Sequence, residues 1–160
     1  MEKAESRMIS VYEMSDILEH AAVVMLGSNG PRNDYGSGEL YSSIEAHTIG
    51  YIADHPDCTV TEIAKSWFKT KGAVSQMLKR LRAAGLVERR LDPRDEKRVL
   101  LRLTPKGKML DAKHRQYDEV YFRKALELLE KEYTHQQISQ AFLVLKTWCG
   151  YAQEIIRAAE

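Results

Sequence analysis

The spacing of apolar residues predicts a mainly helical chain with one pair of strands. Apolar positions recur every three or four residues, the period of a half-buried helix. We expect helices over residues 8–26, 42–54, 71–84 and 104–129, a short helix from residue 59 and a last helix from residue 134. Residues 86–91 and 98–104 have the pattern of two strands, and the charged, turn-forming residues 92–97 connect them.

Local signals mark where several helices begin. Residues 42–45, 59–62 and 134–137 form capping boxes, in which a Ser or Thr and a Glu or Gln three residues later satisfy each other's backbone N–H groups. Thr70 is a good N-cap for the helix that ends at Gly85, and Pro105 suits the first position of the long helix. Capped helices in succession predict a helix-turn-helix.

Two segments carry expectations about burial. In the helix over residues 42–54 we expect the buried side to contain Ile44, His47, Ile49, Tyr51 and Ile52. Residues 27–38 hold four glycines and one proline among polar residues, so we expect a loop that the core does not anchor. Such a loop is either a lid over a pocket or simple slack.

The helix over residues 71–84 has two contrasting faces. Its apolar stripe consists of Val74, Met77, Leu78 and Leu81. The opposite side carries Lys71, Gly72, Ser75, Gln76, Lys79, Arg80 and Arg82. An ordinary solvated helix also has a charged face, but here a basic hairpin follows directly. A basic helix beside a basic hairpin indicates a DNA-reading winged helix.

Charge is concentrated in this part of the chain. The net charge is only +1, but residues 65–108 contain 14 of the 24 Lys and Arg residues and 4 of the 23 Asp and Glu residues. Such an imbalance is expected when one surface neutralises phosphates and the remainder stays acidic. Chance clustering is the alternative.

Composition bounds the class of protein. Hydrophobic residues at 44% and charged residues at 29% are normal for a globular protein, and no apolar run is long enough for a membrane span. The polar start does not resemble a signal peptide, and two distant cysteines, Cys58 and Cys149, suit a reducing compartment better than a disulfide framework. We therefore expect a cytoplasmic protein. Its 160 residues suit one domain, or one domain with an association element.

The last helix needs a partner. Its apolar residues exceed what the first and long helices can cover within one chain, which leaves Phe142, Trp148 and Ile156 as candidates for exposure. A large exposed apolar patch is typical of an interface. We expect a two-fold homodimer with these helices as its core.

Three short motifs in the middle of the chain are together distinctive: GLVERR from residue 85, the turn DPRDEKR from residue 92, and LTPKG from residue 103. With the helices before them they resemble the MarR family of bacterial winged helix transcription regulators, most strongly over residues 42–110. Trp67 and Phe68 depart from the smaller turn expected before the recognition helix. The resemblance implies a mainly α fold with a small β wing, with a DNA-binding lobe at residues 39–108 between dimerisation segments at residues 1–38 and 109–160.

The resemblance also implies the function. We expect a transcriptional regulator, a repressor relieved by a ligand, that binds an inverted repeat in double-stranded DNA as a homodimer with half-sites about 10 bp apart. Ser75, Gln76 and Lys71 are the candidates for base edges, with Gly72 permitting close approach of the backbone. Thr70, Lys79 and Arg80 are the candidates for phosphates, and the wing contributes Arg94, which the family's pattern directs to the minor groove, with Lys97 and Arg98.

The sensing function is open. Small aromatic or anionic effectors of MarR-like proteins bind where the dimer helices meet the DNA-binding lobe, which here implies Tyr41, His47, Tyr51 and Tyr117, although each is equally an ordinary core or surface residue. Redox sensing would use Cys58, whose position before a capped helix would lower its thiol pKa. Zinc sensing would draw on Glu39, Glu45, His47, His55, Cys58 and His114, whose spacing is no recognised ligand motif. We expect no resident metal or cofactor.

Other function classes are weaker. Winged helices also serve as protein interaction modules, but such a module has no need for the basic residues gathered here. An enzyme is disfavoured because the chain has no glycine-rich phosphate loop, no nucleophile elbow and no paired carboxylates in an apolar setting.

Overall fold

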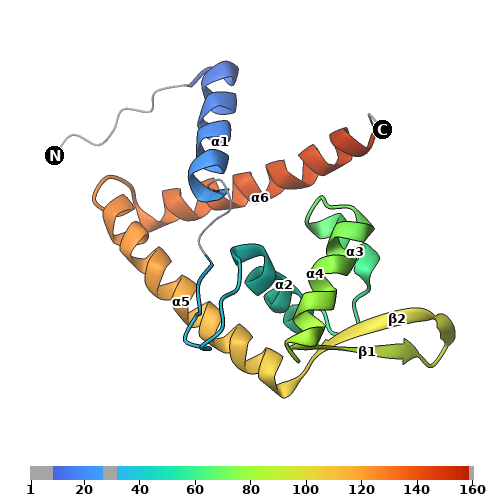
Figure 1. The fold of residues 1–160 in the computed structure, drawn as a ribbon. Coiled ribbons are helices and arrows are strands. Elements are labelled where there is room, and N and C mark those ends of the chain that lie inside the picture. The colour runs from blue at the N-terminus through green and yellow to red at the C-terminus, as the bar shows by residue number, and fades with distance from the viewer. Residues whose placement is uncertain (1–8, 27–31, 159–160) are drawn as a thin grey trace. The chain divides into compact units, whose positions relative to one another are not determined.

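The fold is shown by a computed structural model that describes residues 9–26 and 32–158 (Figure 1). The elements are α1 (Val11–Leu26), α2 (Ser43–Asp54), α3 (Val60–Ser66), α4 (Lys71–Ala83), β1 (Val87–Asp92), β2 (Asp95–Leu103), α5 (Pro105–Leu129) and α6 (His135–Ala158). The prediction of a mainly helical fold with a small β wing is confirmed. Of the first predicted helix, Met8 lies outside the described residues.

The chain divides into two compact units. Of the described residues, one unit contains those from Val11 to Asp118 and the other contains those from Glu119 onward, together with Ile9 and Ser10. The helix α5 crosses the boundary between them. The described part of the chain contains no helix with both the length and the apolar character to span a membrane.

The predicted capping boxes are all present. The Ser42 Oγ accepts from the Glu45 N–H at 3.4 Å, and a Glu45 carboxylate oxygen accepts from the Ser42 N–H at 3.0 Å. The same reciprocal bonds join Thr59 to Glu62 and Thr134 to Gln137. The N-cap of α4 is Thr70, whose Oγ1 accepts from the Ala73 N–H at 3.2 Å. These local bonds explain why the helix starts were predictable.

The core of the first unit lies between the helix-turn-helix, the wing strands and the start of α5. The four residues of the predicted α4 stripe are all buried. They pack in one cluster with Ile49, Ile63, Leu86 and Leu101, each at most 1% exposed. In the turn before α4, Phe68 has a left-handed φ of 49°, and the Lys69 N–H donates to the Ala64 carbonyl at 3.0 Å. This bond closes the end of α3.

The predicted buried side of α2 is wrong in part. Ile49 and Ile52 are buried as expected, but the His47 side chain is 47% exposed. Glu45 is buried in its place, with only 2% of its surface exposed. The apolar period could not reveal this, because the buried position is filled by a charged residue whose partners lie elsewhere in the chain.

The loop before α2 is also anchored more firmly than the sequence suggested. Residues 27–31 lie outside the described part, but from Arg32 onward the loop is held, and Tyr35 is 7% exposed. Asn33 and Tyr41 pair as a short antiparallel bridge, with both N–H···O distances at 2.9 Å. The expectation of a loop without a core anchor is therefore wrong for residues 32–38, the described part of the predicted loop.

The wing is a two-stranded antiparallel hairpin that projects past α4 (Figure 1). Val87 pairs with Leu103 at its base and Asp92 with Asp95 at its tip. The strand β2 starts at Asp95, not at Arg98 as predicted, because the turn is short. The Asp92 and Asp95 carboxylates accept from the N–H groups of Arg94 and Lys97 at 2.9 and 3.0 Å, which stabilises this tight tip.

The second unit, at the C-terminal end, exposes much apolar surface. The Phe142 and Trp148 side chains on α6 are 46% and 54% exposed in the single chain, as predicted, while the side chain of Ile156 lies outside the described part. Phe122 and Phe142 contact edge to face with ring centroids 6.3 Å apart. Ile138 is the buried apolar residue of α6 among those described.

Gly107 lies where α5 meets the base of the wing. A Cβ added to Gly107 would stand 2.1 Å from the Leu86 carbonyl oxygen and 3.3 Å from the Leu103 Cβ. The same carbonyl accepts from the Thr104 N–H at 3.0 Å, so it is not free to move away. The glycine of the LTPKG motif therefore permits a close backbone contact.

We predict that Gly107→Ala lowers the free energy of unfolding by about 1–3 kcal/mol, the usual cost of overpacking. Chemical denaturation followed by circular dichroism would measure it. The matched control is Gly72→Ala in α4, where the new Cβ meets only the Thr70 Oγ1 at 3.9 Å. If Gly107→Ala and the unaltered protein have the same free energy of unfolding, the close contact is contradicted.

Candidate nucleic-acid interface

One face of α4 presents the residues that the sequence singled out. Lys71, Gly72, Gln76, Lys79 and Arg80 are exposed, and Ser75 is half-buried beside them. Thr70, which caps the helix, is exposed too. Since the apolar stripe holds the opposite side in the core, this face is available along the whole helix.

The wing carries the second basic group. Arg94, Lys97 and Arg98 are exposed, with Arg94 in the turn at the tip. Asp92 supports this group in two ways. Its Oδ1 accepts from the Arg94 N–H, and its Oδ2 lies 3.6 Å from an Arg98 terminal nitrogen. Asp92 thus holds the Arg94 backbone and the Arg98 guanidinium in place at the tip of the wing.

The base of the wing is joined to the turn before α3. Leu101 pairs with Cys58, its N–H donating to the Cys58 carbonyl at 2.9 Å, and the Asp57 N–H donates to the Leu101 carbonyl at 3.0 Å. The Arg102 guanidinium also binds the Asp57 carboxylate with two nitrogens, which lowers the pKa of that carboxyl. This contact fixes the wing against the helix-turn-helix.

The buried Glu45 carboxylate links α2 to α4. Its Oε1 accepts from the Arg80 Nε at 3.1 Å. Its Oε2 accepts from the Ser42 N–H and Oγ at 3.0 Å each, and from an Arg32 terminal nitrogen at 3.1 Å. Burial by itself raises the pKa of Glu45, but the Ser42 hydrogen bonds and the charges of Arg32 and Arg80 outweigh it, so the pKa lies below its ordinary value of 4.5.

This bond changes the interpretation of Arg80. The side chain is 65% exposed, but its Nε is engaged by Glu45. Its exposed part is available for a phosphate while the inner part holds α4 to α2. Sequence reasoning assigned Arg80 only the first of these roles, because the capping-box glutamate gave no sign of a second partner.

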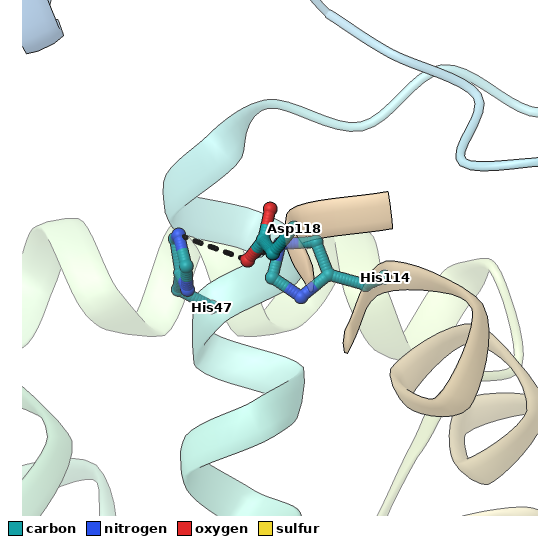
Figure 2. A group of neighbouring side chains, drawn as sticks. All are labelled: His47, His114 and Asp118. Carbon is teal, nitrogen blue, oxygen red and sulfur yellow. Dashed lines mark ion pairs between the residues drawn. The ribbon is translucent and has the colours of Figure 1, made fainter. Parts of the chain in front are cut away.

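A cluster of residues of the kinds that bind metal ions lies elsewhere in the same unit. Figure 2 shows His47 from α2 facing His114 and Asp118 from α5. The Asp118 Oδ2 is 3.2 Å from the His114 Nε2 and 3.8 Å from the His47 Nε2. One ligand atom from each residue lies within 4.8 Å of the others. The sequence-based set included both histidines and missed Asp118, which stands one helical turn after His114.

Aromatic side chains surround His114, which is 3% exposed. Its ring meets Tyr35 edge to face at a centroid distance of 4.9 Å and His47 at 4.6 Å. Burial lowers the pKa of His114 and favours its neutral form. Tyr117 contacts Tyr35 at 5.1 Å, so two of the four predicted effector residues, His47 and Tyr117, border this cluster.

The other predicted sensor residues have different partners. Tyr41 is buried and its hydroxyl donates to Glu39 at 2.5 Å, and Tyr51 stacks on His55 at 4.3 Å. Glu39 also pairs with Lys106, and Glu45 with its two arginines. Of the six zinc candidates, His47 and His114 are the two that share the metal-ligand cluster found among the described residues.

The lowered thiol pKa that redox sensing by Cys58 would need is not found. The side chain is 6% exposed, and burial together with the negative charges of Glu62 and Asp57 raises the pKa of its thiol to about 11. The dipole of the short helix α3 is outweighed because Cys58 lies inside the contact between the turn and β2.

Comparison with known proteins agrees with this geometry. Residues 41–98 match the family model described as MarR family. An uncharacterized HTH-type transcriptional regulator of Bacillus subtilis (strain 168), YhjH, is 30% identical over 105 residues, which are 66% of this chain and 59% of that protein. This chain thus matches less than two thirds of the length of that relative.

Solved structures show the same fold. FabT of Streptococcus pneumoniae, in complex with DNA, matches with a TM-score of 0.60 at 23% identity, over 90% of this chain and 92% of that one. ZitR of Lactococcus lactis, a zinc-responsive MarR family member, matches with a TM-score of 0.62 at 23% identity, over 85% and 96% of the two chains. BldR of Sulfolobus solfataricus, a transcriptional regulator, matches with a TM-score of 0.65 at 22% identity, over 88% and 99%.

The raised thiol pKa makes a direct prediction. In a Cys149→Ser variant, the remaining Cys58 should react with a thiol-specific disulfide reagent at pH 7 far more slowly than free cysteine, because little thiolate is present and the sulfur is buried. The reaction should become fast in denaturant. Rapid labelling of the folded variant would contradict the assignment of Cys58 as a core residue.

Proposed function

Because this chain belongs to the MarR family of winged helix-turn-helix proteins, which are regulators and not enzymes, we propose that it is a transcription regulator that binds double-stranded DNA. The observation that carries the proposal is the exposed polar and basic face of α4 beside a wing with Arg94 at its tip. An α-helix of this kind fits the major groove, and a basic hairpin beside it reaches the adjacent minor groove.

Each residue has a role in this proposal. Lys71, Ser75 and Gln76 read base edges, and Gly72 permits close approach. Thr70, Lys79 and the exposed part of Arg80 bind phosphates, which set the position of α4 without reading sequence. In the wing, Arg94 enters the minor groove, and Lys97 and Arg98 bind the backbone beside it.

We propose that the protein acts as a homodimer. The support is the apolar surface on the last helix, where Phe142, Trp148 and Ile155 are exposed in the single chain. In this assignment residues 1–38 and 109–160 form the dimer and residues 39–108 bind DNA. Two-fold symmetry then requires an inverted repeat, and occupancy of that operator represses transcription until a change in effector occupancy releases the protein.

The wing assignment is tested by Arg94→Ala. We expect operator binding to weaken by about 1–3 kcal/mol, because one groove contact is lost. Fluorescence anisotropy on the DNA upstream of the protein's own gene, with scrambled DNA for comparison, would measure it. Lys131→Ala, which removes one positive charge from the turn after α5, is the control. Equal affinities of the Arg94 variant and the unaltered protein would remove Arg94 from the site.

The dimer is tested by sedimentation equilibrium. We expect two chains per particle at micromolar concentration, and a shift toward single chains for Trp148→Asp, because a carboxylate in an apolar interface is costly. Circular dichroism would check that the variant stays folded. A folded monomer of the unaltered protein at micromolar concentration would refute the proposal.

A second candidate concerns the effector. The His47, His114 and Asp118 cluster supplies two imidazole nitrogens and a carboxylate oxygen, a donor set that zinc accepts in proteins. The three residues fit a metal because they already converge, with half of the His47 side chain open to solvent. One of the structural relatives is described as zinc-responsive. We propose that a divalent metal such as zinc binds here, bridges α2 to α5 and so changes the affinity for DNA.

The metal site is tested by His47→Ala. We expect the zinc affinity, measured by competition with a chromophoric chelator, to fall by at least the 10- to 100-fold typical of weakened metal sites. His55→Ala is the matched control, since His55 lies on the same segment but stacks on Tyr51 outside the cluster. Undiminished zinc binding by the His47 variant would place any metal site elsewhere.

A further inference from the structure

The loop of residues 32–41 contacts the metal-ligand cluster on one side. On the other side it contacts the Glu45 carboxylate, which binds Arg80 of α4. The bridge between Asn33 and Tyr41 closes this loop, so its ends cannot move independently. Lys113 donates to the Gly36 carbonyl, and Lys106 pairs with Glu39 at 2.9 Å, which ties the loop to α5. A displacement on one side of such a closed loop is therefore passed to the other side.

On one side, the loop packs against the cluster. The Tyr35 ring meets His114 edge to face at 4.9 Å and Tyr117 at 5.1 Å. Tyr35 is 7% exposed and His114 is 3% exposed, so the two rings are packed closely against each other. The position of Tyr35 is consequently set by the position of the His114 imidazole.

On the other side, the loop binds Glu45. The Arg32 guanidinium donates to the Leu40 carbonyl at 3.0 Å and to the Glu45 Oε2 at 3.1 Å. The second oxygen of the same carboxylate holds the Arg80 Nε of α4. The route from His114 to Arg80 therefore runs through the Tyr35 ring, the backbone of the closed loop, Arg32 and Glu45, all within one compact unit.

We propose that Glu45 is a positioning residue for DNA binding, which couples the position of the loop to α4 and so connects metal occupancy of the cluster to DNA affinity. This inference rests on the DNA-binding and metal-binding functions proposed above. A bound metal immobilises the His114 ring, and with it Tyr35 and the loop. Arg32 then stays on Glu45, and Glu45 on Arg80. The helix α4 then loses less conformational entropy when the protein binds its operator, so the metal tightens DNA binding.

The test compares four proteins: the unaltered chain, Arg32→Gln, Glu45→Gln and Glu62→Gln. DNA affinity is measured on the upstream DNA with and without zinc, and zinc affinity is measured separately by chelator competition. Glu62 is the matched control, because it is also a capping-box glutamate but its hydrogen-bond partner is Thr59. Arg32→Gln provides the decisive result if Glu45→Gln does not fold, since the Arg32 side chain is 53% exposed and Ser42 and Arg80 still bind the Glu45 carboxylate in that variant.

We expect zinc to tighten DNA binding by the unaltered chain and by Glu62→Gln within the range of about 5- to 150-fold that is typical of coupled sites. Arg32→Gln and Glu45→Gln should bind zinc normally and lose most of that increase. Without zinc, Arg32→Gln should bind DNA more weakly than the unaltered chain, with an unchanged salt dependence, because Arg32 supports α4 and contacts no phosphate.

A full zinc effect in Arg32→Gln, with unchanged affinity in its absence, would overturn the coupling while leaving both proposed functions intact. A reduced salt dependence of Arg32→Gln would also overturn it, since Arg32 would then be a phosphate contact. If the unaltered chain binds DNA and does not respond to zinc, the metal proposal fails, and the link from metal to DNA fails with it. The zinc-free affinity of Arg32→Gln then still decides whether Glu45 positions α4. If the unaltered chain does not bind DNA, the proposed function itself fails.

Discussion

The Glu45 carboxylate is the interaction on which the arrangement of the proposed DNA-binding lobe depends. A buried charge is stable only when hydrogen bonds and opposite charges replace its water, and here Ser42, Arg32 and Arg80 do so from three separate places in the chain. The low pKa of this carboxyl keeps it ionised at neutral pH. Removing any one partner leaves the charge less compensated, so the start of α2, the preceding loop and α4 are held as one group.

The wing is fixed by different means. Backbone pairing of Leu101 with Cys58 and the ion pair between Arg102 and Asp57 attach β2 to the turn before α3. Gly107 lets α5 approach the Leu86 carbonyl at the base of the hairpin. Since α4 and the wing are fixed to the same core, their two basic surfaces keep a constant separation. A constant separation is what a rigid duplex requires of a protein that contacts two adjacent grooves.

The proposed regulation places the opposite demand on the proposed lobe, because a ligand acts only if it binds one of two arrangements better than the other. The loop of residues 32–41 meets this demand better than the core does. It contacts the core through Tyr35, Tyr41 and a few polar bonds, so small shifts there cost less than shifts among buried aliphatic side chains. A sensor beside this loop is therefore well placed to influence α4 without disrupting the fold.

Much of the fold was predictable from the sequence, because its signals are local. The capping boxes at residues 42–45, 59–62 and 134–137 involve side chains within one turn, and the α4 stripe is a repeat within one helix. The full length of α5 follows from Pro105 at its start and an uninterrupted pattern after it. The exposed face of α4 was predictable for the same reason, since burying one side of a helix exposes the other.

Tertiary structure alone decided the rest. The same Glu45 side chain that caps α2 is also the buried partner of Arg80, and no pattern near it in the sequence indicates that second role. Asp118 joins His47 because α5 lies against α2, and Cys58 is made inert by a strand from far along the chain. These properties depend on which distant groups share a dry environment. The sequence by itself determined the elements and the exposed polar face of α4, whereas burial, ion pairing and the convergence of possible metal ligands arose only when the packed chain brought distant residues together.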